Sequence, residues 1–276
     1  MHPYVGEYIK SLPDLKGKVV LDIPCGDGEA SYEFYQKGAI VKAFDLYPEF
    51  MKTKSIEAKF ADLTKGIPLE NNSVDYILCE EGIEHISDQV RVFQEFNRVL
   101  KKDGELLITT PNASHFRARL ARFFLESDSL KKMPATEIDS IWFAEEKSNR
   151  LYFGHLFLLG VQDLQTIAAI TGFQVRRRLR TDFGRNSLLI GIVLYPILVV
   201  ITLLVWSKYR KKNKKIAENL RKTVLWQRVK LNIAPTTLFY KHIFWIMAKR
   251  LEQNEIIGHL KIIKRKKYSN QNPYDL

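Results

Sequence analysis

The chain has 276 residues, of which 46% are apolar, so a normal hydrophobic core can form in one large domain with an addition or in two small domains. The net charge of +12 is unevenly distributed, because residues 207–276 hold 18 Lys and Arg against 4 Asp and Glu. A basic appendage on a near-neutral body indicates an anionic partner, either membrane lipid or nucleic acid. The only cysteines, Cys25 and Cys79, lie in apolar contexts, which excludes a disulfide framework and favours a reduced compartment.

Short apolar strands alternate with amphipathic helices through the first part of the chain. The strands are expected over residues 19–23, 40–45, 56–61, 73–79, 105–110 and 173–179. The helices are expected over residues 29–37, 89–101 and 161–171. This alternation is typical of an α/β fold of Rossmann-like kind, with helices on both faces of a parallel sheet. Residues 112–150 are less regular and are interpreted as an insertion over the pocket, with a helix over 116–125.

The turn after the first strand reads Leu21-Asp22-Ile23-Pro24-Cys25-Gly26-Asp27-Gly28. Its glycines let the backbone approach a ligand closely. It lacks the third glycine of the dinucleotide fingerprint and the Lys-Ser/Thr pair of a phosphate-binding loop. Asp22 suits a cationic amino acid that carries a sulfonium, and Asp45, at the end of the second strand, can accept hydrogen bonds from both ribose hydroxyls. Either acid alone could simply cap a strand, but their spacing favours a ligand.

These segments resemble the class I S-adenosylmethionine (SAM)-dependent methyltransferases, whose first motif reads hydrophobic-Leu-Asp-x-Gly-x-Gly-x-Gly. Pro24 departs from the motif, because the family usually has glycine there. Further matches within about residues 15–180 are Ala43-Phe44-Asp45-Leu46, Phe60-Ala61-Asp62-Leu63, residues 73–79 with the following Glu80-Glu81-Gly82-Ile83-Glu84-His85-Ile86, and residues 93–112. The resemblance implies a mostly parallel seven-stranded sheet and SAM as the cofactor, with Asp62 accepting from the adenine amino group. The cofactor contacts that it implies are Asp22, Pro24, Cys25, Gly26, Gly28, Asp45, Leu46, Asp62, Leu63 and Glu80.

His85 is the main candidate for a catalytic residue, as a general base for a hydroxyl acceptor, because it follows the fourth strand and titrates near neutral pH. Alternatively it orients a loop or caps a helix. Glu81 and Glu84 are weaker candidates, and His115 and His155 lie in the irregular insertion. The residues around His155 loosely resemble the methyltransferases of bacterial surface glycans and lipid-linked substrates. No Cys/His cluster has the spacing of a metal site, so no metal is expected.

Residues 188–206 form an uncharged run of 19 residues, which is just long enough to span a bilayer. Pro196 would kink a helix there, and basic residues flank both ends, so both ends favour the cytoplasmic side. We therefore expect an in-plane or re-entrant hairpin kinked at Pro196, with a single span as an alternative. The basic run over 208–215 would then meet anionic headgroups, and residues 236–251 would form an interfacial helix. The soluble alternative is a buried strand over 187–194 followed by a buried helix.

The last strand of the sheet is expected over residues 256–264. The predicted organisation is a SAM-binding domain over 1–185 with a substrate cap over 112–158, a membrane-associating insertion over 186–255, and a final strand with a basic tail over 256–276. The N-terminus lacks the pattern of a signal peptide, so none is expected.

The predicted function is O-methylation of a lipid-linked sugar or another membrane-borne small molecule at the cytoplasmic face of a membrane. The partners expected are this small-molecule or lipid-linked substrate and membrane lipids, which residues 188–206 and the basic run would contact. The alternatives are an RNA methyltransferase that uses the basic C-terminal region, which is less favoured because RNA binding does not need a long apolar run, and a non-catalytic SAM-binding scaffold.

Overall fold

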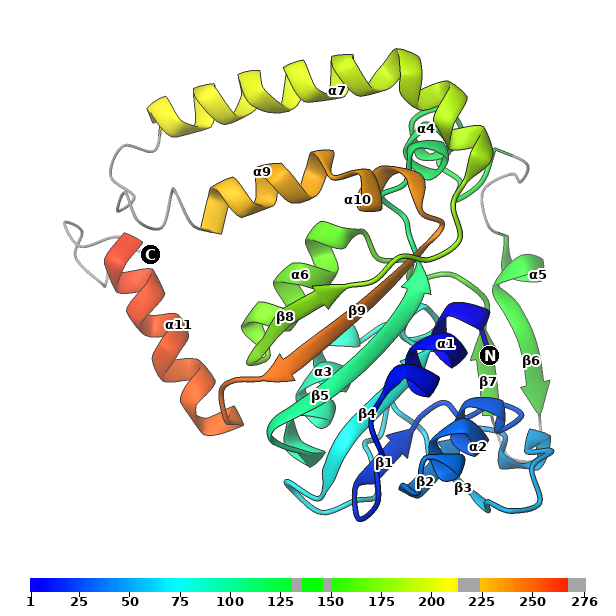
Figure 1. Ribbon diagram of the computed structural model, residues 1–276. Helices are drawn as coiled ribbons and strands as arrows, with labels where there is room; N and C mark the ends of the chain where they lie inside the picture. Colours follow the sequence, from blue (N-terminus) through cyan, green and yellow to red (C-terminus); the bar gives the residue numbers. More distant parts are fainter. Residues whose placement is uncertain (131–135, 146–149, 213–223, 268–276) are drawn as a thin grey trace.

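The computed structural model describes residues 1–130, 136–145, 150–212 and 224–267. One sheet of seven strands has the order β3-β2-β1-β4-β5-β9-β8 (Figure 1). The first five of these pair in parallel, and β9 is antiparallel to both of its neighbours. The mostly parallel seven-stranded sheet predicted from the sequence is therefore confirmed. The strands are β1 Val19–Asp22, β2 Ile40–Asp45, β3 Ala58–Phe60, β4 Val74–Glu80, β5 Leu100–Pro111, β8 Phe173–Arg178 and β9 His242–Lys249.

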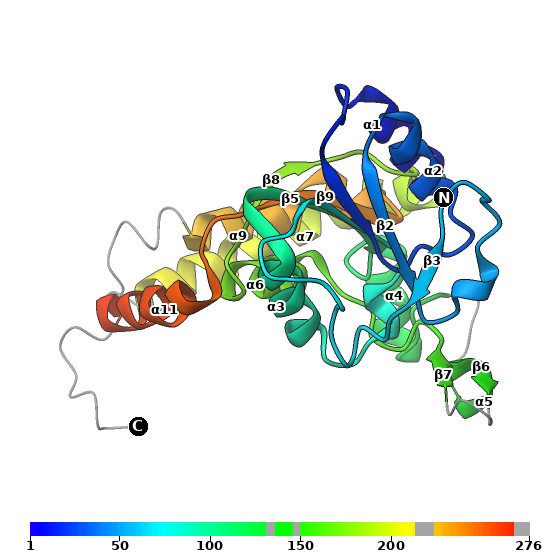
Figure 2. The same ribbon diagram turned by 90° about the horizontal axis from the view of Figure 1, so that it is seen from below.

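Helices cover both faces of this sheet (Figure 2). Helices α1 (Pro3–Ser11) and α2 (Glu29–Gln36) pack on one face, where Ile9 and Phe34 are fully buried. Helices α3 (Gln89–Val99) and α6 (Val161–Ile170) pack on the other face. The central strands bury successive side chains on opposite faces, so they need an uninterrupted apolar sequence.

The smaller elements lie mainly after β5 and around the sheet edges. Two short 3-10 helices are η1 (Pro48–Phe50) and η2 (Ile83–His85). The irregular insertion holds α4 (Phe116–Leu125), as predicted, α5 (Glu137–Ser140) and a hairpin of β6 (Ile141–Glu145) and β7 (Arg150–Phe153). Residues 131–135 and 146–149 of the predicted cap lie outside the described residues.

The predicted position of the last strand is wrong. Residues 256–264 belong to helix α11 (Gln253–Lys267), and the last strand is β9, within the stretch that was expected to be an interfacial helix. Seven of the eight β9 residues are buried, because the strand lies between β5 and β8. Its terminal lysine, Lys249, is also buried, and its ammonium group donates to Asn72 and to the carbonyl of Leu100. The sheet therefore extends into the predicted membrane-associating region.

The long apolar segment forms a single helix, α7 (Arg185–Lys212), which continues through Pro196. It is the one helix among the described residues that is long and apolar enough to cross a membrane. The hairpin expected at Pro196 does not form, and neither does the alternative of a buried strand. The chain instead folds back after α7, so that α9 (Trp226–Ile233) lies beside α7 and leads into α10 (Pro235–Phe239) (Figure 1). Residues 213–215 of the predicted basic run and residues 268–276 of the predicted tail lie outside the described residues.

One face of α7 packs on the body of the protein. Asn232 of α9 donates to the Thr202 hydroxyl at 3.0 Å, and Trp206 contacts Trp226. A Cβ atom on Gly191 would lie 2.4 Å from the ring of Phe239, so the glycine allows α7 to approach α10. The opposite face carries apolar side chains in contact with solvent, among them Leu189 and Val193, which are 72% and 65% exposed.

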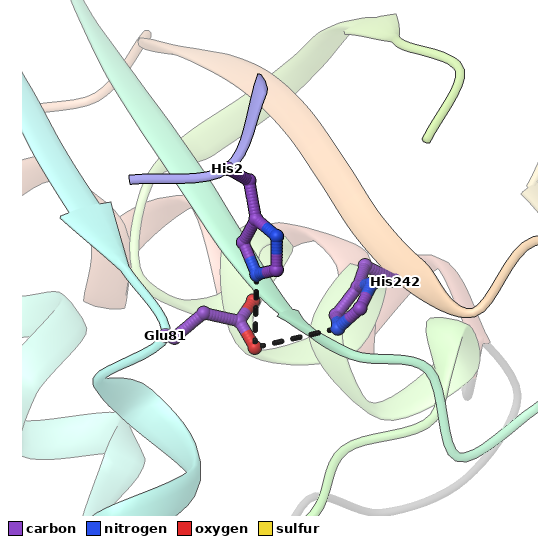
Figure 3. Close-up of side chains that lie close together, drawn as sticks. All are labelled: His2, Glu81 and His242. Atoms are coloured by element: carbon purple, nitrogen blue, oxygen red, sulfur yellow. Dashed lines mark ion pairs between the residues drawn. The ribbon is translucent and has the colours of Figure 1, made fainter. Parts of the chain in front are cut away.

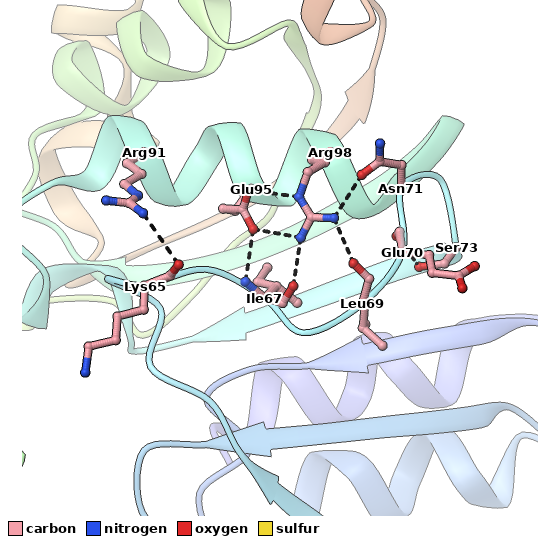
Figure 4. Close-up of polar contacts among 9 residues, drawn as sticks. All are labelled: Lys65, Ile67, Leu69, Glu70, Asn71, Ser73, Arg91, Glu95 and Arg98. Atoms are coloured by element: carbon pink, nitrogen blue, oxygen red, sulfur yellow. Dashed lines mark hydrogen bonds and ion pairs between the residues drawn. The ribbon is translucent and has the colours of Figure 1, made fainter.

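The loop that leads into β4 is fastened to α3 by Arg98 (Figure 4). The Arg98 guanidinium donates to the carbonyl oxygens of Ile67 and Leu69, each at 2.7 Å, and pairs with Glu95. Glu95 in turn accepts from the backbone N–H of Ile67 at 3.0 Å. This network fixes residues 67–71, which lie a few residues after the predicted cofactor contacts Asp62 and Leu63.

Candidate functional site

The predicted cofactor residues gather at the carboxyl ends of β1, β2 and β4, where parallel strands of an open α/β sheet form their ligand crevice. Two cavities lie there, and Pro24 lines both. The smaller, of about 320 Å³, is also lined by Asp22, Cys25, Gly26 and Glu80. The larger, of about 360 Å³, is also lined by Asp45, Leu46, Asp62 and Leu63. Of the ten predicted contacts, nine therefore line one cavity or the other.

Gly28 is the exception, since it lines neither cavity. It begins α2 with a positive φ of 83°, a conformation that favours glycine. A Cβ atom at this position would lie 2.0 Å from the sulfur of Met51. Gly28 therefore shapes the turn rather than lining either cavity.

The smaller cavity is acidic. Asp22 is 1% exposed, and its carboxylate accepts a hydrogen bond of 2.5 Å from the Ser31 hydroxyl. Burial raises the pKa of Asp22 to about 7, although this hydrogen bond opposes the rise. Burial also raises the pKa of Glu80, which accepts from the backbone N–H of His2. Buried acids of this kind favour a cationic ligand group such as an amine or a sulfonium.

The larger cavity has the polar groups expected for a nucleoside. Asp45 accepts from the backbone N–H groups of Gly26 at 2.8 Å and Tyr47 at 2.9 Å, which fix its carboxylate at the cavity wall. Asp62 is held by the backbone N–H and hydroxyl of Thr64. The β6–β7 hairpin contributes Tyr152, which the sequence did not single out.

Pro24 is accommodated by a glycine on the neighbouring loop. The Ile23–Pro24 peptide bond is cis, and the proline ring lies against Gly82, after β4. A Cβ atom on Gly82 would lie 2.4 Å from Cδ of Pro24. The substitution of the usual motif glycine by Pro24 therefore leaves the turn at the cavity intact.

His85 lines the larger cavity, as its predicted role requires. Its Nδ1 lies 2.7 Å from the carbonyl oxygen of Phe153, which can only accept, so Nδ1 carries the proton and Nε2 has the lone pair. Burial lowers the pKa of His85, which keeps the ring neutral near pH 7. Its ring also contacts His155, at 5.1 Å between centroids.

Of the two weaker candidates, Glu81 and Glu84, only Glu84 lies within ion-pair distance of His85 among the described residues. Glu84 is fully buried, accepts from Thr110 at 3.0 Å and lies 3.9 Å from Nε2 of His85. Burial raises the pKa of Glu84 and of Glu81, and the charge of Glu84 raises the pKa of Glu81 further. His115, by contrast, accepts from the N–H of Ala118 at the start of α4, outside both cofactor cavities.

A second group of titratable side chains was missed in the sequence. His2, Glu81 and His242 converge from α1's start, the end of β4 and β9 (Figure 3). Glu81 lies 3.8 Å from Nε2 of His2 and 3.6 Å from Nε2 of His242. Their ligand atoms lie within 4.8 Å of one another, as do those of Glu84, His85 and His155, so either group could hold a metal ion. The two histidines are 240 positions apart, so no local spacing reveals them.

Residues 21–108 match the family model described as a methyltransferase domain. These residues therefore carry a methyltransferase domain, and the sheet order around them agrees with the resemblance to the class I SAM-dependent enzymes. Among curated relatives, the ubiquinone biosynthesis O-methyltransferase of Xanthomonas oryzae pv. oryzae is 29% identical over 121 residues, which are 41% of this chain and 51% of that protein. The enzyme of the same name from Xylella fastidiosa is 30% identical over 138 residues, 45% of this chain and 52% of that protein. The matches thus span about half the length of these relatives.

Solved structures agree on the fold. A SAM-dependent methyltransferase from Methanosarcina mazei covers 91% of this chain and 99% of its own, with 15% identity and a TM-score of 0.51. At this identity the likeness concerns the fold alone. The methyltransferase domain implies SAM as the cofactor. The acidic cavity suits its cationic part, and the larger cavity has polar groups that suit its nucleoside.

Proposed function

We propose that this protein transfers the methyl group of SAM to a hydroxyl of a small molecule presented at the cytoplasmic face of a membrane. The observation that carries this proposal is the position of α7, an exposed apolar helix that begins beside the ends of β5 and β9, close to the cofactor crevice. The names of the curated relatives support O-methylation. The acceptor is a lipid-linked sugar or another membrane-borne molecule, such as one of ubiquinone biosynthesis.

His85 is the proposed base. In the transfer, the bond between the methyl carbon and sulfur breaks, a bond from that carbon to the acceptor oxygen forms, and the hydroxyl proton must leave. A neutral His85 with a free Nε2 can take this proton, and its hydrogen bond to Phe153 stabilises the imidazolium that results. The hairpin over the cavity, which holds Tyr152, serves as the substrate cap.

Membrane attachment is proposed to occur through the exposed face of α7. An apolar side chain contributes roughly 1.5–3 kcal/mol when it is fully removed from water, so several exposed residues together favour lipid strongly. Lys208, Arg210 and Lys211 follow the apolar stretch on the same helix and would meet anionic headgroups, each adding about 1 kcal/mol.

The test is calorimetry of SAM binding to the full chain in detergent, followed by transfer of labelled methyl groups to a membrane lipid extract. We expect Asp45→Ala to weaken SAM binding roughly tenfold or more, since a charge-assisted hydrogen bond is worth about 1.5–3 kcal/mol. Glu57→Ala, which removes an exposed acid outside both cavities, serves as the control. His85→Gln should abolish transfer and change SAM affinity much less than Asp45→Ala does, although His85 also lines the larger cavity. Unchanged SAM affinity in Asp45→Ala would contradict the cofactor site.

A further inference from the structure

A third cavity, of about 540 Å³, lies at the start of α7, between α4 and the residues that lead into β9. We propose that it binds the phosphate or pyrophosphate group of a lipid, and that this lipid is the methyl acceptor. The inference rests on the proposed function for the acceptor's role, but the anion site itself stands on the cavity's own residues. The cationic residues that line it are Arg117, Arg122, Arg185 and Lys241.

The charge in this cavity is one-sided. Among the described residues that line it, Asp128 is the only acid, against four cations. Within the described part of the chain, the side chains of these four cations make no ion pair. Burial, followed by the charges of Arg117 and Lys241, lowers the pKa of His115 to about 4, which agrees with a positive potential at this wall. Cations without an ion-pair partner around a cavity favour an anionic ligand. The two parallel N–H donors of an arginine fit two phosphate oxygens.

The cavity also leads towards the cofactor. His242 lines it, and Nε2 of His242 lies 3.6 Å from Glu81, which lines the acidic cofactor cavity. His242 and Glu81, with His2 beside them, therefore link a wall of the anion site to a wall of the acidic cofactor cavity (Figure 3). A group attached to a phosphate in the cavity could extend past His242 and Glu81 towards the acidic cofactor cavity.

The surroundings favour a lipid as the source of the phosphate rather than a soluble ion. Arg185 and Ser187 line the cavity at the very start of α7. The exposed apolar face begins at the next residue, Leu188, and continues with Leu189. α4, which forms another wall, carries Phe123 and Phe124, which are 80% and 68% exposed. Cations beside exposed apolar groups are the arrangement that a phosphate at a bilayer surface requires.

The experiment compares two double variants of the full chain that lose equal charge. Arg117→Gln with Lys241→Gln changes the cavity, and Lys16→Gln with Lys54→Gln changes two exposed lysines that line neither this cavity nor the cofactor cavities and lie outside α7. Inorganic pyrophosphate is titrated by calorimetry into protein in detergent. Each protein is then floated with phosphatidylcholine vesicles, with and without an isoprenoid phosphate. SAM binding and circular dichroism are recorded for every protein, and Arg122→Gln with Arg185→Gln replaces the cavity variant if that variant does not fold.

We expect the cavity variant to bind pyrophosphate roughly tenfold more weakly or worse, and to lose the extra flotation that the isoprenoid phosphate gives. The control variant should keep both, and all proteins should bind SAM alike. Equal weakening in the two variants would overturn the cavity as the site. If the cavity variant binds pyrophosphate more weakly but floats as the unaltered protein does, the claim that the bound phosphate belongs to a lipid is overturned. Absence of SAM binding in the unaltered protein would instead contradict the proposed function. The pyrophosphate titration would still test the anion site, because it does not depend on SAM.

Discussion

At the scale of single residues, Pro24 and Gly82 act as a pair. The proline ring occupies the space that a side chain on Gly82 would need, with 2.4 Å between Cδ and the position of a Cβ atom. Because Pro24 lines both cofactor cavities, a displacement of its ring changes the crevice where they meet.

We therefore expect Gly82→Ala to weaken SAM binding and to destabilise the protein by about 1–3 kcal/mol, the usual result of overpacking. Pro24→Gly in the same chain should restore much of the affinity, because it removes the ring that clashes. Gly258→Ala, at a position with open space, serves as the control. The pairing would be refuted if the double variant bound SAM no better than Gly82→Ala.

We expect Asp22 to make the binding of SAM depend on pH. Burial raises its pKa to about 7, so the carboxyl is largely protonated at pH 6 in the free protein. A cationic ligand favours the carboxylate, so the complex holds fewer protons than the free protein, and affinity must increase as the pH rises towards about 8.

Calorimetry between pH 6 and pH 8 should show SAM affinity increasing by at most about tenfold per pH unit, with protons released on binding. Asp22→Asn should remove this dependence. Asp27 lines the same cavity, but its pKa is lowered. Burial acts to raise this pKa, and the hydrogen bonds from the Glu29 N–H and from Lys52 outweigh that effect. Asp27→Asn should therefore keep the dependence, and its loss there would contradict the assignment to Asp22.

At the scale of elements, α7 makes two different sets of contacts. Its inner face packs on α4, α9 and α10, so deletion of the segment would also damage the body of the protein. Substitutions on the outer face avoid this problem.

Leu189→Gln with Val193→Gln should release the protein from lipid vesicles, because each side chain contributes roughly 1.5–3 kcal/mol when it leaves water. The matched control is Tyr35→Gln with Ile40→Gln. These two exposed apolar residues belong to α2 and β2 and lie outside α7. Flotation on a density gradient measures the effect. Unreduced flotation of the α7 variant would mean that another surface attaches the protein.

The loop before β4 depends on α3. Arg98→Met removes the charge-assisted bonds to Ile67 and Leu69, and we expect a loss of about 2 kcal/mol in the free energy of unfolding. Arg91→Met is the control on the same helix, because Arg91 makes only a long bond of 3.5 Å to Lys65. Denaturant unfolding monitored by tryptophan fluorescence compares the two, and equal losses would show that the network has no special role.

At the scale of the whole molecule, the sequence predicts the parts whose information is local. The strands up to β5, the turn at Pro24 and the acids at the strand ends each depend on neighbouring residues. β9 was missed because its aromatic residues and basic ends resemble an interfacial helix, and only its place between β5 and β8 explains why it is extended. The groups around His242 and in the basic cavity join distant segments, so their chemistry emerges only after the sheet is assembled.

The position of β9 has a consequence for the order in which the protein can be built. Among the described strands, β8 pairs only with β9, and β9 follows α7 in the chain. During synthesis, the long edge of β5 must stay uncovered until the apolar helix has emerged and the chain has returned. Completion of the sheet therefore waits until the apolar helix has been made, so a nascent chain presents this helix to its surroundings before the sheet can close.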